Sequence, residues 1–269
     1  MRQRLTKLLR GNPEDLQEWI EDPGSESLFI CLTIILIGFG AYGFTVGLWR
    51  DPIMGCYVAL KMPFLIFTTL AFNGFLNGIL GILLGSGLGF RQSILAQLIS
   101  FTIAALILGS LSPILFFTAL TSPEPDPTVH TISYASFLSV HTILIGIAGV
   151  FANVHLARLL IAFARSKAAA AITFIAWLGG NAFLGTQLAW LMRPFLGSPN
   201  IDIQFVRPDA FESNFYETAW YALRRFSGGH PLELLALLAV ITIILILPLI
   251  KTFEGSRRPS QAPGKNRSS

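Results

Sequence analysis

Neutral polar side chains, rather than carboxylates, are the groups in this sequence that could do chemistry inside a membrane. Asn73 and Asn77 are one helical turn apart in one apolar stretch, and Asn181 and Gln187 occupy a second. His141 lies near the middle of a third. Amide and imidazole groups at membrane depth can hydrogen-bond between helices, and they can also line a polar path for a solute. The sequence leaves both interpretations open.

Two cations extend this candidate set. Lys61 lies just before Pro63 inside an apolar run, and Arg193 follows the stretch that contains Asn181 and Gln187. We interpret Lys61 as an interfacial anchor or as a functional charge in a cavity, depending on where its helix breaks. The candidate packing or pathway residues are therefore Lys61, Asn73, Asn77, His141, Asn181, Gln187 and Arg193.

Several reaction classes lack the residues that they need. The sequence has no HExxH, no GxSxG and no pair of membrane-embedded aspartates, and its 4 histidines have no metal-ligand spacing. No acidic residue occurs between positions 52 and 123 or between 127 and 201, which excludes a carboxylate relay in that region. The 2 cysteines are isolated and suit neither a disulfide framework nor a metal site. We therefore predict no catalytic residue, no cofactor and no metal.

The composition indicates that membrane-spanning helices position the candidate residues. Hydrophobic residues make up 53% of the chain and charged residues only 13%, with a mean hydropathy of +0.63; soluble proteins carry about 25% charged residues. We predict an all-α, polytopic transmembrane bundle of about six spans. The expected spans are residues 27–48, 63–85, 92–120, 132–162, 168–192 and 232–250.

The apolar run from Ile53 to Gly85 is too long for one span. As a single helix it would measure roughly 50 Å against a hydrocarbon core of about 30 Å. Pro63 disfavours helix at the residue before it, and Lys61 is costly at mid-membrane. We therefore predict a break at Lys61-Met62-Pro63, with residues 52–62 forming an interfacial or half-inserted segment.

Two further helices are predicted outside the spans. The outer loop 193–231 contains an expected amphipathic helix at 209–226, because Asp209 and Glu212 have capping-box spacing before an apolar stripe. This helix could be a lid, a partner surface or a lipid sensor, or it could close the end of the bundle. In the N-terminal segment 1–26, Asn12 begins a short amphipathic helix, and the polar tail 251–269 has the composition of a disordered segment.

The distribution of cations predicts the orientation. With six spans, 13 of the 19 Lys and Arg residues lie on the side that holds both termini. The positive-inside rule then places both termini in the cytoplasm. The cations cluster at the ends of apolar segments, so we expect membrane lipid as the partner of the basic surface and no nucleic acid.

Three stretches carry a family resemblance. They are YVALKMPFLIFTTLAFNGFLN, ILGSLSPILFF and WLGGNAFLGTQLAWLMRPFLGSPNIDIQFVRPDAFESNFYE. Together they resemble a family of uncharacterised bacterial multi-span inner-membrane proteins, over roughly residues 49–226. Some members are labelled actin-binding proteins of the WASP-homology type, and their layout is similar to that of Yip-type membrane proteins. The resemblance implies a bacterial cytoplasmic (inner) membrane location but no particular activity.

These observations favour a non-enzymatic role. We expect a structural, assembly or membrane-organising protein that binds a protein partner or a second copy of itself within the bilayer. The alternative is a transporter or channel subunit with a polar path past the second, fourth and fifth spans. An intramembrane enzyme ranks third, and a serine hydroxyl beside His141 would be the feature that favours it.

Overall fold

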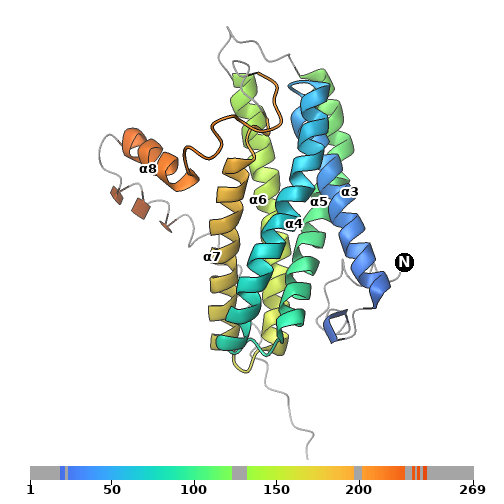
Figure 1. Cartoon of the computed structure of the whole chain (residues 1–269), viewed down its shortest axis with the longest axis vertical. Coiled ribbons are helices and arrows are strands. Elements are labelled where there is room, and N and C mark those ends of the chain that lie inside the picture. Colours follow the sequence, from blue (N-terminus) through green and yellow to red (C-terminus); the bar gives the residue numbers. More distant parts are fainter. Residues whose placement is uncertain are drawn as a thin grey trace, which may run out of the picture.

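The computed structural model describes residues 19–21, 24–122, 132–196, 202–227, 232–233, 235–236 and 239–240 of the chain. Within these residues all regular secondary structure is helical, which confirms the predicted all-α class. The helices are α3 (Ser25–Leu48), α4 (Pro52–Leu83), α5 (Phe90–Thr121), α6 (Ile132–Phe163), α7 (Lys167–Leu191) and α8 (Phe215–Phe226) (Figure 1).

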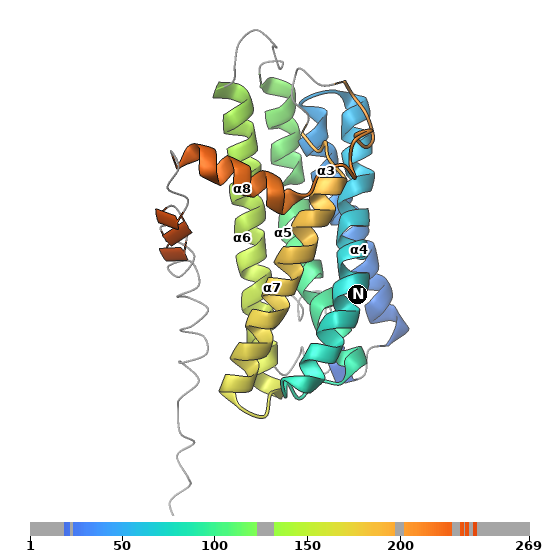
Figure 2. The same ribbon diagram turned by 60° about the vertical axis from the view of Figure 1, so that its left-hand side comes forward.

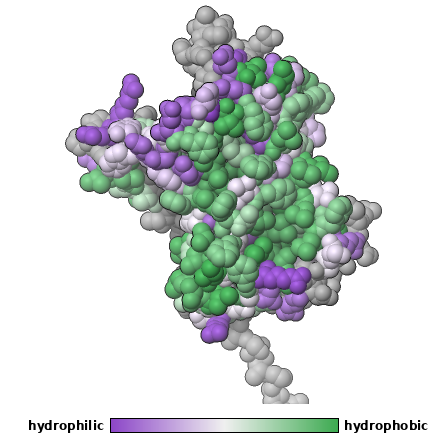
Figure 3. Space-filling model, in the orientation of Figure 1, coloured by the Kyte–Doolittle hydropathy of each residue, from purple (hydrophilic) through white to green (hydrophobic). Residues whose placement is uncertain are grey.

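Five of these helices, α3 to α7, are long and apolar enough to cross a membrane, as expected of a multi-pass membrane protein. They run side by side along the long axis of the molecule (Figures 1 and 2). A broad apolar band covers the middle of the molecule, and hydrophilic residues gather toward its ends and on α8 (Figure 3). Most of the predicted sixth span at 232–250, most of segment 1–26 and the tail 251–269 lie outside the described residues.

Helix α3 packs tightly against α4 and α5 because glycines let the backbones approach. A side-chain carbon on Gly43 would lie only 2.6 Å from the carbonyl oxygen of Val58 on α4. One on Gly109 of α5 would lie 2.8 Å from the Cα of Gly38, and one on Gly38 would overlap the carbonyl of Ala105. These contacts leave no room for a larger residue, so the α3–α4–α5 core is fixed by small side chains.

The predicted break at Lys61-Met62-Pro63 is wrong, because α4 is one continuous 32-residue helix with Pro63 inside it. A proline in a helix interior removes one backbone hydrogen bond and costs about 3 kcal/mol. Tertiary packing offsets that cost here. Gly40 of α3 lies against the same turn, since a side-chain carbon on it would be 3.5 Å from the oxygen of Ala59 and 3.9 Å from Cγ of Pro63. Lys61 is not exposed to lipid but buried in protein.

The connections at one end of the bundle are short and mutually packed. Gly85 and Gly87 adopt positive φ angles of 75° and 76° in the turn between α4 and α5, a conformation that favours glycine. The amide of Arg165, in the link between α6 and α7, donates to the oxygen of Gly85 at 3.4 Å. Ser166 then caps α7 by accepting a hydrogen bond from the amide of Ala169 at 3.1 Å.

The amphipathic helix of the outer loop begins later than predicted, at Phe215 rather than Asp209. Asn214 is its N-cap and accepts a hydrogen bond from the amide of Glu217 at 2.8 Å. Asp209 does not cap it, because its carboxylate pairs with Arg207 at 3.6 Å. Helix α8 is amphipathic, as predicted, and runs crosswise to the long axis of the bundle (Figure 2).

Candidate functional site

Asn73 and Asn181 meet between α4 and α7. The side-chain amide of Asn73 donates to Oδ1 of Asn181 at 2.8 Å. Gly180 lets the helices approach here, since a side-chain carbon on it would lie 3.6 Å from Oδ1 of Asn73 and 3.4 Å from Oδ1 of Asn77. The structure thus joins two of the predicted residues across a helix contact.

Asn77 has a partner that the sequence did not reveal. Its amide donates to Oε1 of Gln97 on α5 at 3.0 Å, and both side chains are fully buried. Gln97 in turn donates to the backbone oxygen of Ser93 at 3.4 Å. The only available signal for Gln97 was a polar side chain inside a predicted span, and nothing in the sequence specified which helix it faces.

His141 pairs with α3 instead of joining the asparagines. The hydroxyl of Tyr42 lies 2.9 Å from Nδ1 of His141, and both side chains are buried. Phe137 packs against the imidazole with ring centroids 4.5 Å apart, and Trp49 stacks on Phe137 at 4.9 Å. The hydroxyl beside His141 is therefore a phenol in an aromatic cluster, not a serine prepared for nucleophilic attack.

Lys61 is fully buried beneath the segment that follows α7. Its ammonium donates to the backbone oxygen of Pro194 at 2.6 Å. It also lies 5.8 Å from the ring centroid of Phe195 and 5.1 Å from that of Phe205, within cation–π range. Lys61 thus ties the outer loop to α4 instead of anchoring the helix at a lipid interface.

Arg193 immediately precedes Pro194, the residue whose oxygen Lys61 contacts. Its guanidinium stacks on Trp190 at 3.1 Å from the ring centroid, and the guanidinium of Arg207 lies 5.2 Å from that ring. Burial lowers the pKa of Arg193 and the nearby charge of Arg207 lowers it further, while Asp209 acts in the opposite direction. Two like charges therefore lie close together at this end of α7.

Gln187 attaches the outer helix to α7. Its Oε1 accepts a hydrogen bond from the amide of Phe215 at 3.0 Å, at the start of α8. Tyr216 stacks on Phe183 with ring centroids 4.8 Å apart, and its hydroxyl lies 2.8 Å from the hydroxyl of Thr186. The role of Gln187 in the structure is thus to position α8 rather than to join the asparagine pair.

Several buried polar atoms between α4 and α7 have no hydrogen-bond partner among the described residues. They are Oδ1 of Asn73, Oδ1 of Asn77, Oγ1 of Thr173 and Nε1 of Trp177. Buried polar groups are normally paired with protein or water. Amide oxygens, a hydroxyl and an indole N–H in one helix contact could bind a small polar solute. Among the described residues no three His, Cys, Asp or Glu side chains gather to hold a metal.

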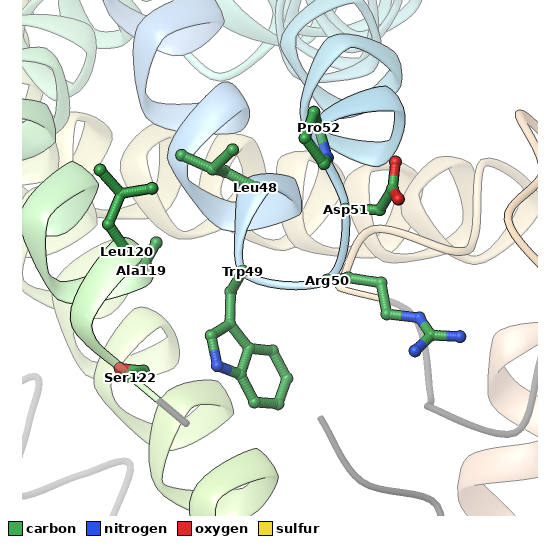
Figure 4. A pocket seen from close by; sticks show the side chains of 8 residues that line it. All are labelled: Leu48, Trp49, Arg50, Asp51, Pro52, Ala119, Leu120 and Ser122. Carbon is green, nitrogen blue, oxygen red and sulfur yellow. The ribbon is translucent and has the colours of Figure 1, made fainter. Parts of the chain in front are cut away.

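A cavity of about 460 Å³ lies at the other end of the α3–α5 contact, away from the asparagines. The turn between α3 and α4 and the end of α5 form it (Figure 4). Asp51 at its rim is already engaged, because its carboxylate accepts a hydrogen bond from the amide of Ile53 at 2.7 Å. Ser122, the last described residue before segment 123–131, is among the residues that line the cavity.

Comparison with protein-family models, curated proteins and solved structures finds no match to this chain. The family resemblance of residues 49–226 stays a prediction, and the function must be argued from the geometry alone.

Proposed function

We propose that this chain is a non-enzymatic protein of the bacterial cytoplasmic membrane that organises or assembles membrane components by binding partner helices within the bilayer. Both termini are cytoplasmic in this proposal. The observation that carries it is a set of glycines on α6 and α7 that face open space, namely Gly146, Gly149, Gly179 and Gly185.

These glycines differ from those in the core of the bundle. Gly38, Gly43 and Gly47 of α3 all pack directly against a neighbouring backbone. By contrast, a side-chain carbon on Gly146 or Gly185 would meet no atom within 4 Å. Small residues at transmembrane helix surfaces allow close helix association. The bare surfaces of α6 and α7 therefore suit the approach of another transmembrane helix.

The buried fraction of each span also separates α3 from α6 and α7. The most apolar window of α3 is 50% buried inside the described bundle, whereas those of α6 and α7 are each 22% buried. Four of the interior polar side chains are meanwhile engaged with one another, in the Asn73–Asn181 and Asn77–Gln97 pairs. This pattern favours binding through a helix surface over chemistry in the interior.

Site-specific photo-crosslinking in living cells tests the proposal. A benzophenone amino acid placed at Gly149 or Gly185 should yield a discrete crosslinked product of higher mass, either with a second copy or with another membrane protein. The matched control is Phe64, which is 62% exposed on α4. A crosslink only within the chain, mapped to residues 232–250, would show that the protein covers this surface itself. That result, or equal crosslinking from Phe64, would overturn the proposal.

The orientation is tested separately. The turn between α3 and α4, the end of α5 and the segment that follows α7 share one end of the bundle (Figure 1), and this end carries the minority of the cations, as the positive-inside rule requires of the outer side. A fluorescent protein fused after Ser269 should fold and fluoresce, because that domain matures in the cytoplasm. A periplasmic reporter active at the same position would contradict a cytoplasmic C-terminus.

A second candidate is a transporter or channel subunit, favoured by the oxygens of Asn73 and Asn77, which have no hydrogen-bond partner among the described residues. Cysteines introduced at Gly180 and Asn181 should react with a membrane-impermeant thiol reagent if a water-filled path passes between α4 and α7. A cysteine at Ala170, which is fully buried on α7, supplies the unreactive control. If the cysteines at all three positions are equally protected from the reagent, the transporter or channel function is excluded.

A further inference from the structure

Three cations from different parts of the chain converge where α7 ends. Lys61 comes from α4, Arg193 directly follows α7, and Arg207 returns from the outer loop. The backbone amide of Arg207 donates to the oxygen of Arg193 at 3.3 Å, which holds the two arginine segments together. We call these three residues the basic cluster.

Acidic groups do not balance the basic cluster. Among the described residues the one ion pair of the cluster joins Arg207 to Asp209 at 3.6 Å, and the Asp209 side chain is 54% exposed. Lys61 is fully buried, and among the described residues its hydrogen bond goes to a backbone oxygen rather than to a carboxylate. Burying a charge without a counter-charge is costly. The cluster therefore has two positive charges in excess of its one acidic neighbour.

The arginines also retain unused hydrogen-bond donors. Nε of Arg193 and both Nε and Nη2 of Arg207 are buried and have no partner among the described residues. The Arg207 side chain is only 16% exposed, so bulk water satisfies little of it. Buried guanidinium donors side by side are suited to the oxygens of a phosphate group, which they can bind in a bidentate manner.

Aromatic rings pack against the cations of the basic cluster. Trp190 stacks on Arg193, while Phe195 and Phe205 cover Lys61. Tyr57 packs edge-on against Phe205 with centroids 5.4 Å apart.

We propose that the basic cluster is a binding site for a phosphate-type oxyanion, supplied either by the headgroup of an anionic lipid or by a soluble phosphate. Arg193 and Arg207 bind the anion through their unused N–H groups. Lys61 adds positive charge from below and positions Arg193 by holding Pro194. Asp209 competes with the anion for Arg207. This site is separate from the glycine surfaces of α6 and α7, so either proposal can fail alone.

The first experiment measures thermal unfolding of the full-length protein in a neutral detergent. Phosphatidylglycerol and sodium phosphate are titrated separately, with phosphatidylcholine and sodium chloride at matched ionic strength as the respective controls. A rise in Tm with phosphatidylglycerol alone identifies a lipid headgroup, and a rise with phosphate as well identifies a general phosphate site. No rise above either control overturns the proposal.

Substitutions then test which residues act. R193Q and R207Q should each weaken the apparent affinity about tenfold or more, because each removes a charge-assisted hydrogen bond. D209N should strengthen it, because the competing carboxylate is lost. If the Arg207–Asp209 ion pair is purely structural, D209N should instead lower the Tm and leave the response to the anion unchanged.

The matched control removes two positive charges elsewhere, one more than either single arginine variant. Arg91 and Lys167 are exposed near the other end of the bundle, so the double variant R91Q/K167Q should keep the full response. If R193Q or R207Q fails to fold, D209N still decides the question, because it alters no cation. An unchanged affinity in D209N, or a normal response in either arginine variant, would refute the assignment.

Discussion

The Asn73–Asn181 pair allows a quantitative test of whether the buried amides stabilise the bundle. The bond is short at 2.8 Å, and Asn73 is 1% exposed. Interhelical hydrogen bonds in membrane proteins contribute about 0.6 kcal/mol on average and about 1.7 kcal/mol at most. Because this bond is short and one partner is fully buried, we expect a coupling energy of about 1 to 1.7 kcal/mol between N73A and N181A. N181A alone should cost about 1–3 kcal/mol, since it leaves a buried donor without an acceptor.

The assay is a double-mutant cycle on the free energy of unfolding, measured by SDS titration of the protein in mixed micelles and followed by tryptophan fluorescence. Asn153 provides the control, because its amide bonds the oxygen of Gly149 on its own helix at 2.8 Å. N73A and N153A should be additive within about 0.5 kcal/mol. A coupling below about 0.3 kcal/mol for the Asn73–Asn181 pair would refute the reasoning, because solvent-filled surroundings would then screen the two amides.

Two other predictions address the Tyr42–His141 pair and the outer helix. Y42F should lower the free energy of unfolding by about 1–3 kcal/mol, because it removes the hydroxyl 2.9 Å from Nδ1 of His141 in a buried site; a loss below about 0.5 kcal/mol in the same SDS titration would contradict that bond. N214A removes the N-cap of α8 and should destabilise this helix by about 1 kcal/mol. Hydrogen exchange of the α8 amides should then be about fivefold faster while that of α5 is unchanged, and uniform acceleration in both helices would argue against a local cap.

The spans could be predicted from sequence because their limits depend on local properties. Hydrocarbon thickness sets a minimum apolar length, and turn residues end each helix. The fourth and fifth spans were expected at 132–162 and 168–192, and α6 and α7 occupy Ile132–Phe163 and Lys167–Leu191. Ser166 between them is a local N-cap, so no long-range information was needed.

Errors arose where tertiary contacts override local preferences. Pro63 is a helix breaker by itself, but Gly40 of α3 packs against its turn and α4 continues through it. Asp209 has the right spacing for a cap, but Arg207 is a stronger partner for its carboxylate than a backbone amide. In the first case the competing group, Gly40, is distant in sequence. In the second case it is Arg207, which belongs to an irregular loop. Residue periodicity describes neither kind of contact.

The candidate side chains were predictable as a set, but their partners were not. Polar residues in apolar helices must find hydrogen bonds, so Asn77 and His141 were expected to have partners. Gln97 and Tyr42 supply these bonds only because of how α5 and α3 are arranged around α4 and α6. Helix order and rotation in a bundle depend on surface packing, and nothing local to one helix specifies them.

The shortage of acidic residues has a different consequence in the folded protein than in the sequence. In the sequence it excludes a carboxylate relay through the spans. In the structure it leaves Lys61, Arg193 and Arg207 with one exposed carboxylate between them, that of Asp209. A buried cation needs a counter-charge, and the described chain does not supply enough of them. The same property that argues against internal chemistry therefore argues for an external anion, and a membrane rich in anionic headgroups is a ready source of one.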